Sequence, residues 1–441
     1  MRLPSVGFTD KETESGMLKV ALKRTALKNL TRDGWLLFLT RSARLFAYGS
    51  LSVVLVLYLN SIGLSESQTG LLLTLTLIGD TLVSLWLTTR ADRIGRRRVL
   101  KIGAVLMAAA GLTFAATGNL FLLIIAGTVG VISPSGNEVG PFLSIEQAAL
   151  SHVVSDRMRT AVFAWYAVAG AFATAIGALF AGLLVQLLQR TPVTTTGRYR
   201  TVVVLYAAMG VLLAFLFSRA SSATEIRLPD EISAAPARMQ TFLGIGNSRR
   251  IVLKLSALFA LDSFGGGFVV QAFAAYWFYI RFGVDPATLG SIFFGANVLA
   301  GISALLASRL ASRFGLVNTM VFTHLPSNVL LILVPLMPTL SSAVLVLFLR
   351  FSISQMDVPT RHSYTMAVVR PEERSATAGI TGVARTTGAA VAPLFAGFLF
   401  ARPRLINVPF FIAGTLKIVY DLLLYQSFKA IHPPEERMRK C

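Results

Sequence analysis

Charged residues are scarce in this sequence: they make up 14% of its 441 residues, whereas soluble domains usually carry about 25%. Cysteine is nearly absent, and because Cys441 stands alone, no internal disulfide can hold the fold together. The sequence also lacks a phosphate-binding GxxxxGKS loop, a metal-ligand spacing and a hydrolase nucleophile motif. These absences exclude an ordinary soluble enzyme and give no support to ATP-driven pumping. We therefore expect no catalytic residues, no metal and no cofactor.

Long apolar runs are the main feature that the sequence does have. Hydrophobic residues make up 54% of the chain, and runs of about 20 residues, each long enough to cross a hydrocarbon core as a helix, recur from Gly34 almost to Lys429. The runs lack the alternation that barrel strands need. The sequence therefore predicts an all-α polytopic membrane protein with about twelve transmembrane helices in the lipid bilayer.

The apolar runs fall into two sets of six, separated by a polar stretch. That stretch contains Pro229 and Pro236 and too few apolar residues for a span, which predicts a cytoplasmic linker. We expect a cytoplasmic lead-in, an N-terminal six-helix bundle, the linker, a C-terminal six-helix bundle and a cytoplasmic tail at residues 1–33, 34–219, 220–250, 251–428 and 429–441.

Short basic clusters between the apolar runs carry the formal net charge of +20. Arg93, Arg96 and Lys101 belong to one such cluster, whereas the loops at 60–67 and 117–120 contain no lysine or arginine. Because cytoplasmic loops carry an excess of positive charge, we expect both termini to be cytoplasmic and the protein to reside in the plasma (cell) membrane. The clusters form no continuous basic face, so we expect no nucleic-acid partner.

The two halves of the chain repeat each other. A shift of 220 residues superimposes glycines and arginines of the early spans, and a shift of 215 residues superimposes those of the later spans. The matched pairs include Gly70 with Gly290, Arg93 with Arg313, Gly95 with Gly315, and Gly182 with Gly397. Such a parallel duplication predicts a substrate site between the halves, near the middle of the membrane.

One loop carries a specific motif. Asp92, Arg93 and Gly95 are followed by a basic run, and Arg313 with Gly315 repeats part of the pattern in the second half. Glycine permits the tight turn that such a short loop needs. The arrangement resembles the loop signature between the second and third helices of the major facilitator superfamily. The resemblance implies the fold of a secondary transporter in which these five residues take part in the conformational change.

Two helices carry small residues at regular spacing, as exporters of this family do. These residues are Gly177, Ala178, Ala181 and Gly182 in the fifth helix, and Gly388, Ala392, Pro393, Ala396 and Gly397 in the eleventh. Small residues let helices approach closely, and proline bends a helix. The pattern slightly favours export, although close packing alone would also produce it.

Ionisable residues lie deep in several predicted spans, where each costs at least about 2.5 kcal/mol on insertion scales. The candidates for the cavity or for coupling are Glu138, Asp262, Asp357, Arg361 and His362, on helices that line the central cavity in the resembling family. Glu138 and Asp357 are each followed by valine and then closely by proline, which frees a backbone carbonyl beside the acid. We predict that one of these two acids carries a coupling proton. The alternative is that they cap broken helices or hold the halves together.

Two arginines of the first helix and one acid of the fourth lie nearer the cytoplasm. We predict that Arg41 or Arg44 pairs with Glu146 as part of a cytoplasmic gate, because a carrier that rocks two halves must seal one end. The alternative is that these arginines, together with Arg361, bind a charged substrate.

Other ionisable residues of the spans are less informative. His324 is predicted to be a hydrogen-bonded packing residue, and Asp80 and Arg385 receive no role. Lys417 and Asp421 have the four-residue spacing of neighbours on one helix face, so we predict that they neutralise each other.

The sequence therefore predicts a secondary active transporter that moves a small-molecule substrate by alternating access, with proton-coupled export preferred. Uptake of a small organic anion is the alternative within transport. A non-transporting membrane sensor or lipid-handling protein is the alternative from another class. No residue pattern identifies the substrate, the coupling ion or the oligomeric state.

Substitution of Asp92 tests the motif. Asp92 is predicted to latch the cytoplasmic ends of the halves in the outward-open state, so Asp92→Asn should insert normally and lose most of its transport. The measurement is transport normalised to surface abundance. Normal transport by a properly inserted Asp92→Asn protein would contradict the latch.

Overall fold

The computed structural model describes residues 30–154, 156–221, 248–370 and 373–431. Most of the predicted lead-in, linker and tail lies outside these residues, and so does the side chain of Asp92. Within them, eleven helical segments are long and apolar enough to cross a membrane, and two of these, Arg249–Phe282 and Leu340–Ala367, each consist of two consecutive helices. The short helices α5 (Leu120–Val129) and α6 (Phe142–Val153) supply the twelfth span. The predicted all-α polytopic membrane fold is therefore confirmed.

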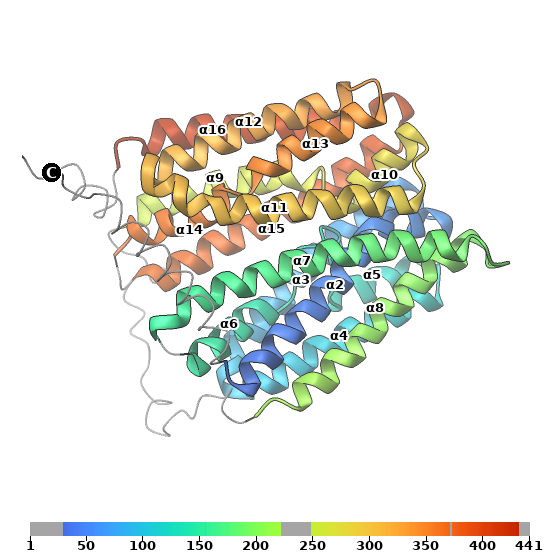
Figure 1. Ribbon diagram of the computed structural model, residues 1–441, viewed down its shortest axis with the longest axis horizontal. Helices are drawn as coiled ribbons and strands as arrows, with labels where there is room; N and C mark the ends of the chain where they lie inside the picture. The colour runs from blue at the N-terminus through green and yellow to red at the C-terminus, as the bar shows by residue number, and fades with distance from the viewer. Residues whose placement is uncertain (1–29, 155, 222–247, 371–372, 432–441) are drawn as a thin grey trace, which may run out of the picture.

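The helices form two bundles that follow one another along the chain (Figure 1). Besides α5 and α6, the first bundle contains α2 Arg32–Ser61, α3 Glu66–Ile94, α4 Arg96–Ala116, α7 Asp156–Leu188 and α8 Thr195–Ser218. The second bundle contains α9 Arg249–Gly267, α10 Gln271–Phe282, α11 Pro286–Phe314, α12 Leu316–Leu333, α13 Leu340–Ser354, α14 Asp357–Ala367, α15 Arg374–Phe400 and α16 Val408–Phe428. Single turns of 3-10 helix follow α12 at Val334–Leu336 and precede α16 at Pro403–Leu405.

Glycines make the sharpest turns at both ends of the bundles. Gly95 joins α3 to α4 with φ +101°, and Gly315 joins α11 to α12 with φ +87°. Gly63 and Gly283 turn at the other end with φ +96° and +64°. Only glycine adopts such angles without steric cost, which explains why these positions recur in the duplication. We call the end with Gly95 and Gly315 the motif end, and the end with Gly63 and Gly283 the opposite end.

Most helices that start at the opposite end have side-chain caps, although α16 does not. The capping residues accept hydrogen bonds from backbone N–H groups of the first turn, which otherwise lack partners. These residues are Ser65, Asn119, Thr194, Asp285 and Thr339, which cap α3, α5, α8, α11 and α13. Polar capping at this rim fixes where each of these helices begins.

Three spans are broken inside the fold. The fourth span is irregular between Val129 and Phe142, where Gly136 and Gly140 have φ +70° and +80°. The tenth breaks between α13 and α14, and the seventh breaks between α9 and α10. Glycine and proline interrupt the backbone ladder in these places. The breaks expose backbone and polar side chains at mid-depth.

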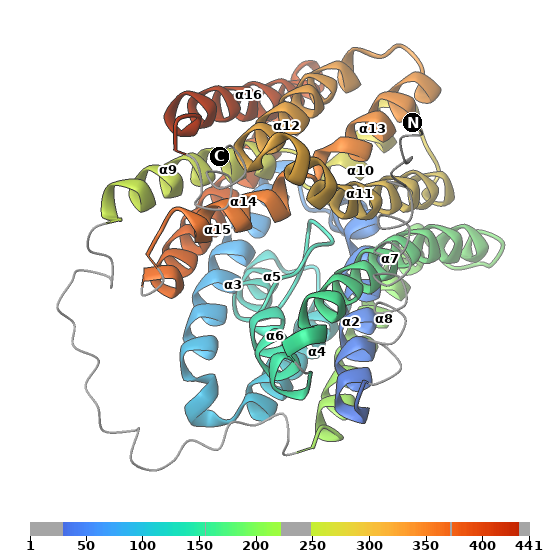
Figure 2. The same cartoon turned by 60° about the vertical axis from the view of Figure 1, so that its left-hand side comes forward.

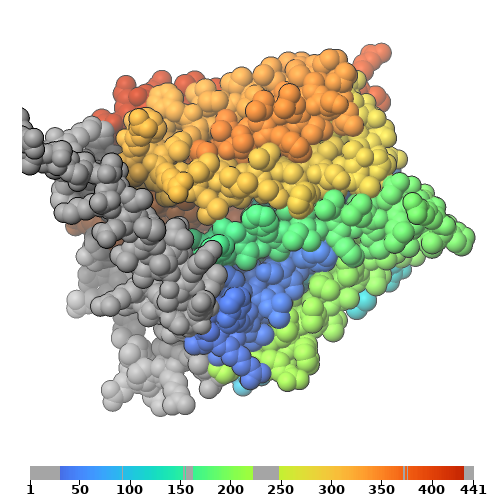
Figure 3. Space-filling view, viewed as in Figure 1, coloured from blue at the N-terminus to red at the C-terminus, as the bar shows by residue number. Residues whose placement is uncertain are grey.

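Paired glycines bring the two bundles into contact. A side chain on Gly182 of α7 would lie 2.3 Å from the Pro286 carbonyl oxygen and 2.9 Å from Cα of Gly290 on α11. On the other side, a side chain on Gly70 of α3 would lie 2.4 Å from the Pro393 carbonyl oxygen and 2.9 Å from Cα of Gly397 on α15. Figure 2 shows α7 beside α11 and α3 beside α15, and Figure 3 shows the seam where the yellow α11 surface meets green α7. The backbones therefore touch on both flanks.

Hydrogen bonds also join the bundles toward the opposite end. The Gln271 side chain donates to Ser52 Oγ at 2.8 Å, and the Tyr276 hydroxyl donates to Glu66 Oε1 at 2.5 Å. The Ala272 amide donates to the carbonyl of Pro134 at 3.0 Å. Together with the glycine contacts, these bonds close the opposite end in this conformation.

The glycine contacts predict how closure can be blocked. Gly397→Val should force α15 away from α3, because overpacking costs about 1–3 kcal/mol, and should open the opposite end. We expect Ser52→Cys, placed in a Cys441→Ser background, to react roughly tenfold faster with an impermeant maleimide added at that end. Gly382→Val is the matched control, because a side chain on Gly382 of the same helix meets open space. Equal labelling rates in both variants would contradict the role of the contact.

Candidate functional site

A cavity of about 480 Å³ lies between the bundles and is lined by residues of both. This volume suits a small organic molecule. The second bundle supplies most of the lining, and the first contributes Ser135, Asn137 and Thr174 among others. The position agrees with the expectation of a site between duplicated halves.

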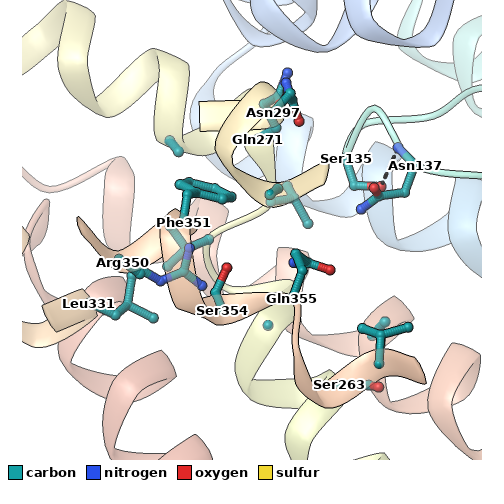
Figure 4. A pocket seen from close by; sticks show the side chains of 18 of the residues that line it. Ser135, Asn137, Ser263, Gln271, Asn297, Leu331, Arg350, Phe351, Ser354 and Gln355 are labelled. Carbon is teal, nitrogen blue, oxygen red and sulfur yellow. Dashed lines mark hydrogen bonds between the residues drawn. The ribbon is translucent and has the colours of Figure 1, made fainter. Parts of the chain in front are cut away.

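The broken spans deliver neutral polar groups to this cavity (Figure 4). Ser135 and Asn137 come from the irregular part of the fourth span, and the backbone N–H of Asn137 donates to Ser135 Oγ at 3.3 Å. Gln271 begins α10 after the break in the seventh span, and its side-chain oxygen accepts from Asn297 at 3.1 Å. Gln355 lies in the break of the tenth span. Irregular backbone is stable at this depth because it faces a cavity and not lipid.

Asp262 of α9 is the centre of a charged cluster on the cavity wall. One carboxylate oxygen accepts from Lys417 Nζ of α16 at 2.6 Å, and the other accepts from Arg361 of α14 at 2.9 Å. His324 Nε2 of α12 lies 3.8 Å from the first oxygen. Side chains of α12, α14 and α16 thus lie around one carboxylate of α9.

Asp421 has different partners from the one predicted. It lies 2.8 Å from His324 Nδ1 and accepts from the Asn328 side chain at 2.9 Å, whereas Lys417 pairs with Asp262. The predicted pairing of Lys417 with Asp421 was therefore wrong. The four-residue spacing allows two side chains to meet, but the neighbouring helices α9 and α12 offer each a closer partner. His324 is hydrogen-bonded, as predicted, and it also lines the cavity.

Asp357 opens α14 and faces the cavity. Its Oδ2 atom lies 3.0 Å from Arg361 of the next turn, and this ion pair lacks hydrogen-bond geometry. Arg361 therefore links Asp357 to Asp262.

Two further arginines line the cavity and have no carboxylate partner in the described part of the chain. Arg350 belongs to α13 and Arg385 to α15, and the Nε atom of each is buried without a hydrogen-bond partner there. Sequence reasoning missed Arg350, which stands alone in an apolar run, and gave Arg385 no role. A search for cations in apolar runs would have found both.

A second charged cluster lies inside the first bundle. Arg44 of α2 pairs with Glu146 of α6 at 2.7 Å and with Glu138 at 3.0 Å, and Arg41 pairs with Glu138 at 3.2 Å. The Tyr166 hydroxyl donates to Glu146 at 2.6 Å. The ion pair of Arg44 with Glu146 is the one expected from the sequence, but both partners belong to the same bundle. In this conformation it joins helices within one half and does not join the two halves.

The structure sorts the five candidates for the cavity or for coupling. Asp262, Asp357 and Arg361 line the cavity. Glu138 is not among the lining residues and is held by two arginines, and His362 is exposed and also lies off the cavity wall. Of the motif residues, Gly95 and Gly315 form the turns, whereas Arg93 and Arg313 are exposed at the motif end.

Comparison with known proteins gives consistent results. Residues 37–354 match the Major Facilitator Superfamily. The uncharacterized membrane protein YJR124C of Saccharomyces cerevisiae is 32% identical over 429 residues, which cover 92% of this chain and 96% of the yeast protein. A bacterial homolog of the human lysosomal transporter Spinster, in an inward-facing and occupied conformation, has a TM-score of 0.70 at 14% identity, covering 90% of this chain and 96% of that chain. A D-xylose-proton symporter has a TM-score of 0.69 at 15% identity, covering 89% and 97%.

The sequence match and the fold agree with the internal geometry. Two duplicated six-helix bundles enclose a polar cavity at their interface, with glycine turns at the loops where the motif was recognised. The chain belongs to the major facilitator superfamily and has the fold of its secondary transporters.

Proposed function

We propose that this protein moves a small organic molecule across the membrane by alternating access and that a proton gradient drives the movement. The cavity between the bundles carries this proposal, because charged groups line it at mid-depth and the breaks of three spans add neutral polar groups. Substrate and coupling sites of duplicated carriers lie in such positions.

The contacts between the bundles support a rocking motion. The glycine pairs and the bonds of Gln271 and Tyr276 hold the opposite end closed. Opening that end requires these contacts to separate while the bundles approach at the motif end. Rigid-body rocking of two repeats around a fixed site has this character.

We propose that the motif end faces the cytoplasm and that both termini lie there. The exposed arginines Arg93, Arg98 and Arg313 at this end support the orientation, because cytoplasmic loops are rich in positive charge. With this orientation the structure is inward-facing. The plasma membrane remains our predicted location, and a fluorescent fusion at the C-terminus tests it.

Export is the direction we propose. The small residues of α7 and α15 favoured export in the sequence. In the structure, Gly182 and Gly397 pack the two bundles together, and this packing role accounts for part of the pattern. Uptake is the second candidate, because the unpaired Arg350 and Arg385 suit inward movement of an organic anion as well as its expulsion.

Transport in vesicles of known orientation tests the proposal. Candidate solutes come from untargeted metabolite comparison of cells with and without the protein, and their flux is then measured in proteoliposomes under an imposed pH gradient. Flux that depends on the gradient and rises in the direction out of the cytoplasm supports proton-coupled export. Solute binding without flux in either orientation would instead favour the sensor or lipid-handling alternative.

Substitution of the two acids tests which one carries the proton. A neutral amide mimics a protonated carboxyl, so Asp357→Asn should still exchange substrate across the membrane and should lose accumulation driven by the pH gradient. Glu138→Gln is the comparison; Glu138 lies off the cavity and forms ion pairs with two arginines. If both variants keep full accumulation driven by pH, the proton is carried elsewhere.

We propose that the Arg44 and Glu146 pair braces α6 on α2, and a double-mutant cycle tests this. Glu146→Met leaves Arg44 with excess buried positive charge and should cost about 3–5 kcal/mol. Arg44→Met together with Glu146→Met leaves Arg41 and Glu138 as a neutral pair, so the double variant should be more stable than the sum of the single losses predicts. Thermal unfolding of the purified variants measures the loss of stability in each. The control is the double variant of Glu146→Met with Arg404→Met, in which the losses should be additive. Additive losses for Arg44 and Glu146 would contradict the brace.

A further inference from the structure

The charges that line the cavity do not balance. Arg350, Arg361, Arg385 and Lys417 provide four positive charges, whereas Asp262 and Asp357 provide two negative ones, which leaves two positive charges in excess. His324 does not remove this excess, because a protonated His324 would be balanced by the adjacent Asp421. The cavity therefore favours a negatively charged occupant.

The excess can be assigned to particular side chains. Lys417 and Arg361 both contact Asp262, and Arg361 also contacts Asp357. These four groups form a neutral set. Arg350 and Arg385 remain, and neither has an ion-pair partner among the described residues. Both side chains are half-buried, and the Nε atom of each is fully buried. A charge without a counter-charge is costly at this depth, so an anion in the cavity would stabilise both arginines.

The surroundings of Arg350 are suited to an oxyanion. Figure 4 shows Arg350 beside Phe351 and Ser354, and its guanidinium carbon lies 4.9 Å from the centre of the Phe351 ring. The Ser354 hydroxyl is buried without a hydrogen-bond partner in the described part of the chain. Because Ser354 lines the cavity, rotation of its side chain toward the cavity would let the hydroxyl donate to the ligand that Arg350 binds.

We propose that the cavity binds a small organic oxyanion whose carboxylate or phosphate groups contact the guanidinium groups of Arg350 and Arg385, which lie on different helices of the cavity wall. This inference rests on the transport function proposed above and names the class of substrate. The planar guanidinium fork matches carboxylate and phosphate oxygens and forms strong charge-assisted hydrogen bonds. The side-chain amides of Asn137 and Gln355 remain for the neutral part of the molecule.

Chemical modification tests the site without requiring transport. Phenylglyoxal reacts with unpaired arginines, and peptide mass spectrometry of the full-length protein measures the rate at each one. Acetate, succinate, citrate and glycerol 3-phosphate are the probes, and glycerol and choline are the neutral and cationic controls. We expect at least one oxyanion to slow modification of Arg350 and Arg385 roughly tenfold and to leave the exposed Arg404 unchanged.

Substitutions then identify the groups that bind. Arg350→Gln and Arg385→Gln should each weaken binding of the protective oxyanion roughly tenfold to a hundredfold, as expected for loss of a charge-assisted contact. Lysine at either position should restore part of the affinity, because it keeps the charge without the fork. Arg404→Gln is the matched control, and binding is followed by the shift in thermal unfolding of each purified variant.

The outcomes separate this inference from the transport proposal. Protection by oxyanions without flux in proteoliposomes supports the anion site and overturns transport. Flux of a neutral or cationic solute that survives both glutamine substitutions overturns the anion site and leaves transport intact. Equal protection by glycerol or choline, or no protection by any oxyanion probe, also overturns the anion site.

Discussion

The cost of an unbalanced charge inside the membrane governs the arrangement of this protein. Insertion scales put that cost at least at about 2.5 kcal/mol for each charged group in a span, so each must find a partner, water or a ligand. In the first bundle Arg41, Arg44, Glu138 and Glu146 cancel one another, and Tyr166 adds a hydrogen bond. This cluster needs nothing from outside. The second bundle places most of its charged groups on the cavity wall, and within the described residues Arg350 and Arg385 have no ion-pair partner. The groups that could bind a charged solute therefore lie mainly in this bundle.

The duplication gives the two bundles matching contacts on both flanks of their interface, as the proposed rocking motion requires. Gly70 and Gly290 are equivalent positions of the two halves, and so are Gly182 and Gly397. In the structure Gly70 packs against Gly397, and Gly290 packs against Gly182. The two flanks of the interface therefore have similar contacts. Because both flanks use the same backbone-to-backbone packing, the bundles can separate at one end without one flank resisting more than the other. Close approach of this kind requires the absence of side chains, which is why small residues recur on α7 and α15.

Local features of the fold could be predicted from the sequence, whereas most side-chain partners could not. Gly95 and Gly315 could be identified as turns because a positive φ is a local requirement that glycine alone meets cheaply. The partner of Lys417 depends on how α16 is rotated against α9, and neither the spacing nor the composition of one helix contains that rotation. Arg350 was overlooked for a related reason: an isolated cation in an apolar run has no motif, and only the packed bundle shows that it faces a cavity.

The two acids with similar sequence surroundings illustrate how the halves have diverged. Glu138 lies in the irregular part of the fourth span and neutralises two arginines of α2, so a proton on it would leave Arg44 with Glu146 and Arg41 with no ion pair among the described residues. Asp357 lies in the first turn of α14, and Arg361 is its one ion-pair partner within the described residues; Arg361 keeps Asp262 as a second partner. Loss of the Asp357 charge therefore disturbs fewer contacts and alters a group that faces the cavity. An anion bound nearby would also compete with Asp357 for Arg361. This competition would couple protonation of Asp357 to solute binding, whereas Glu138, the equivalent acid of the first bundle, does not itself line the cavity.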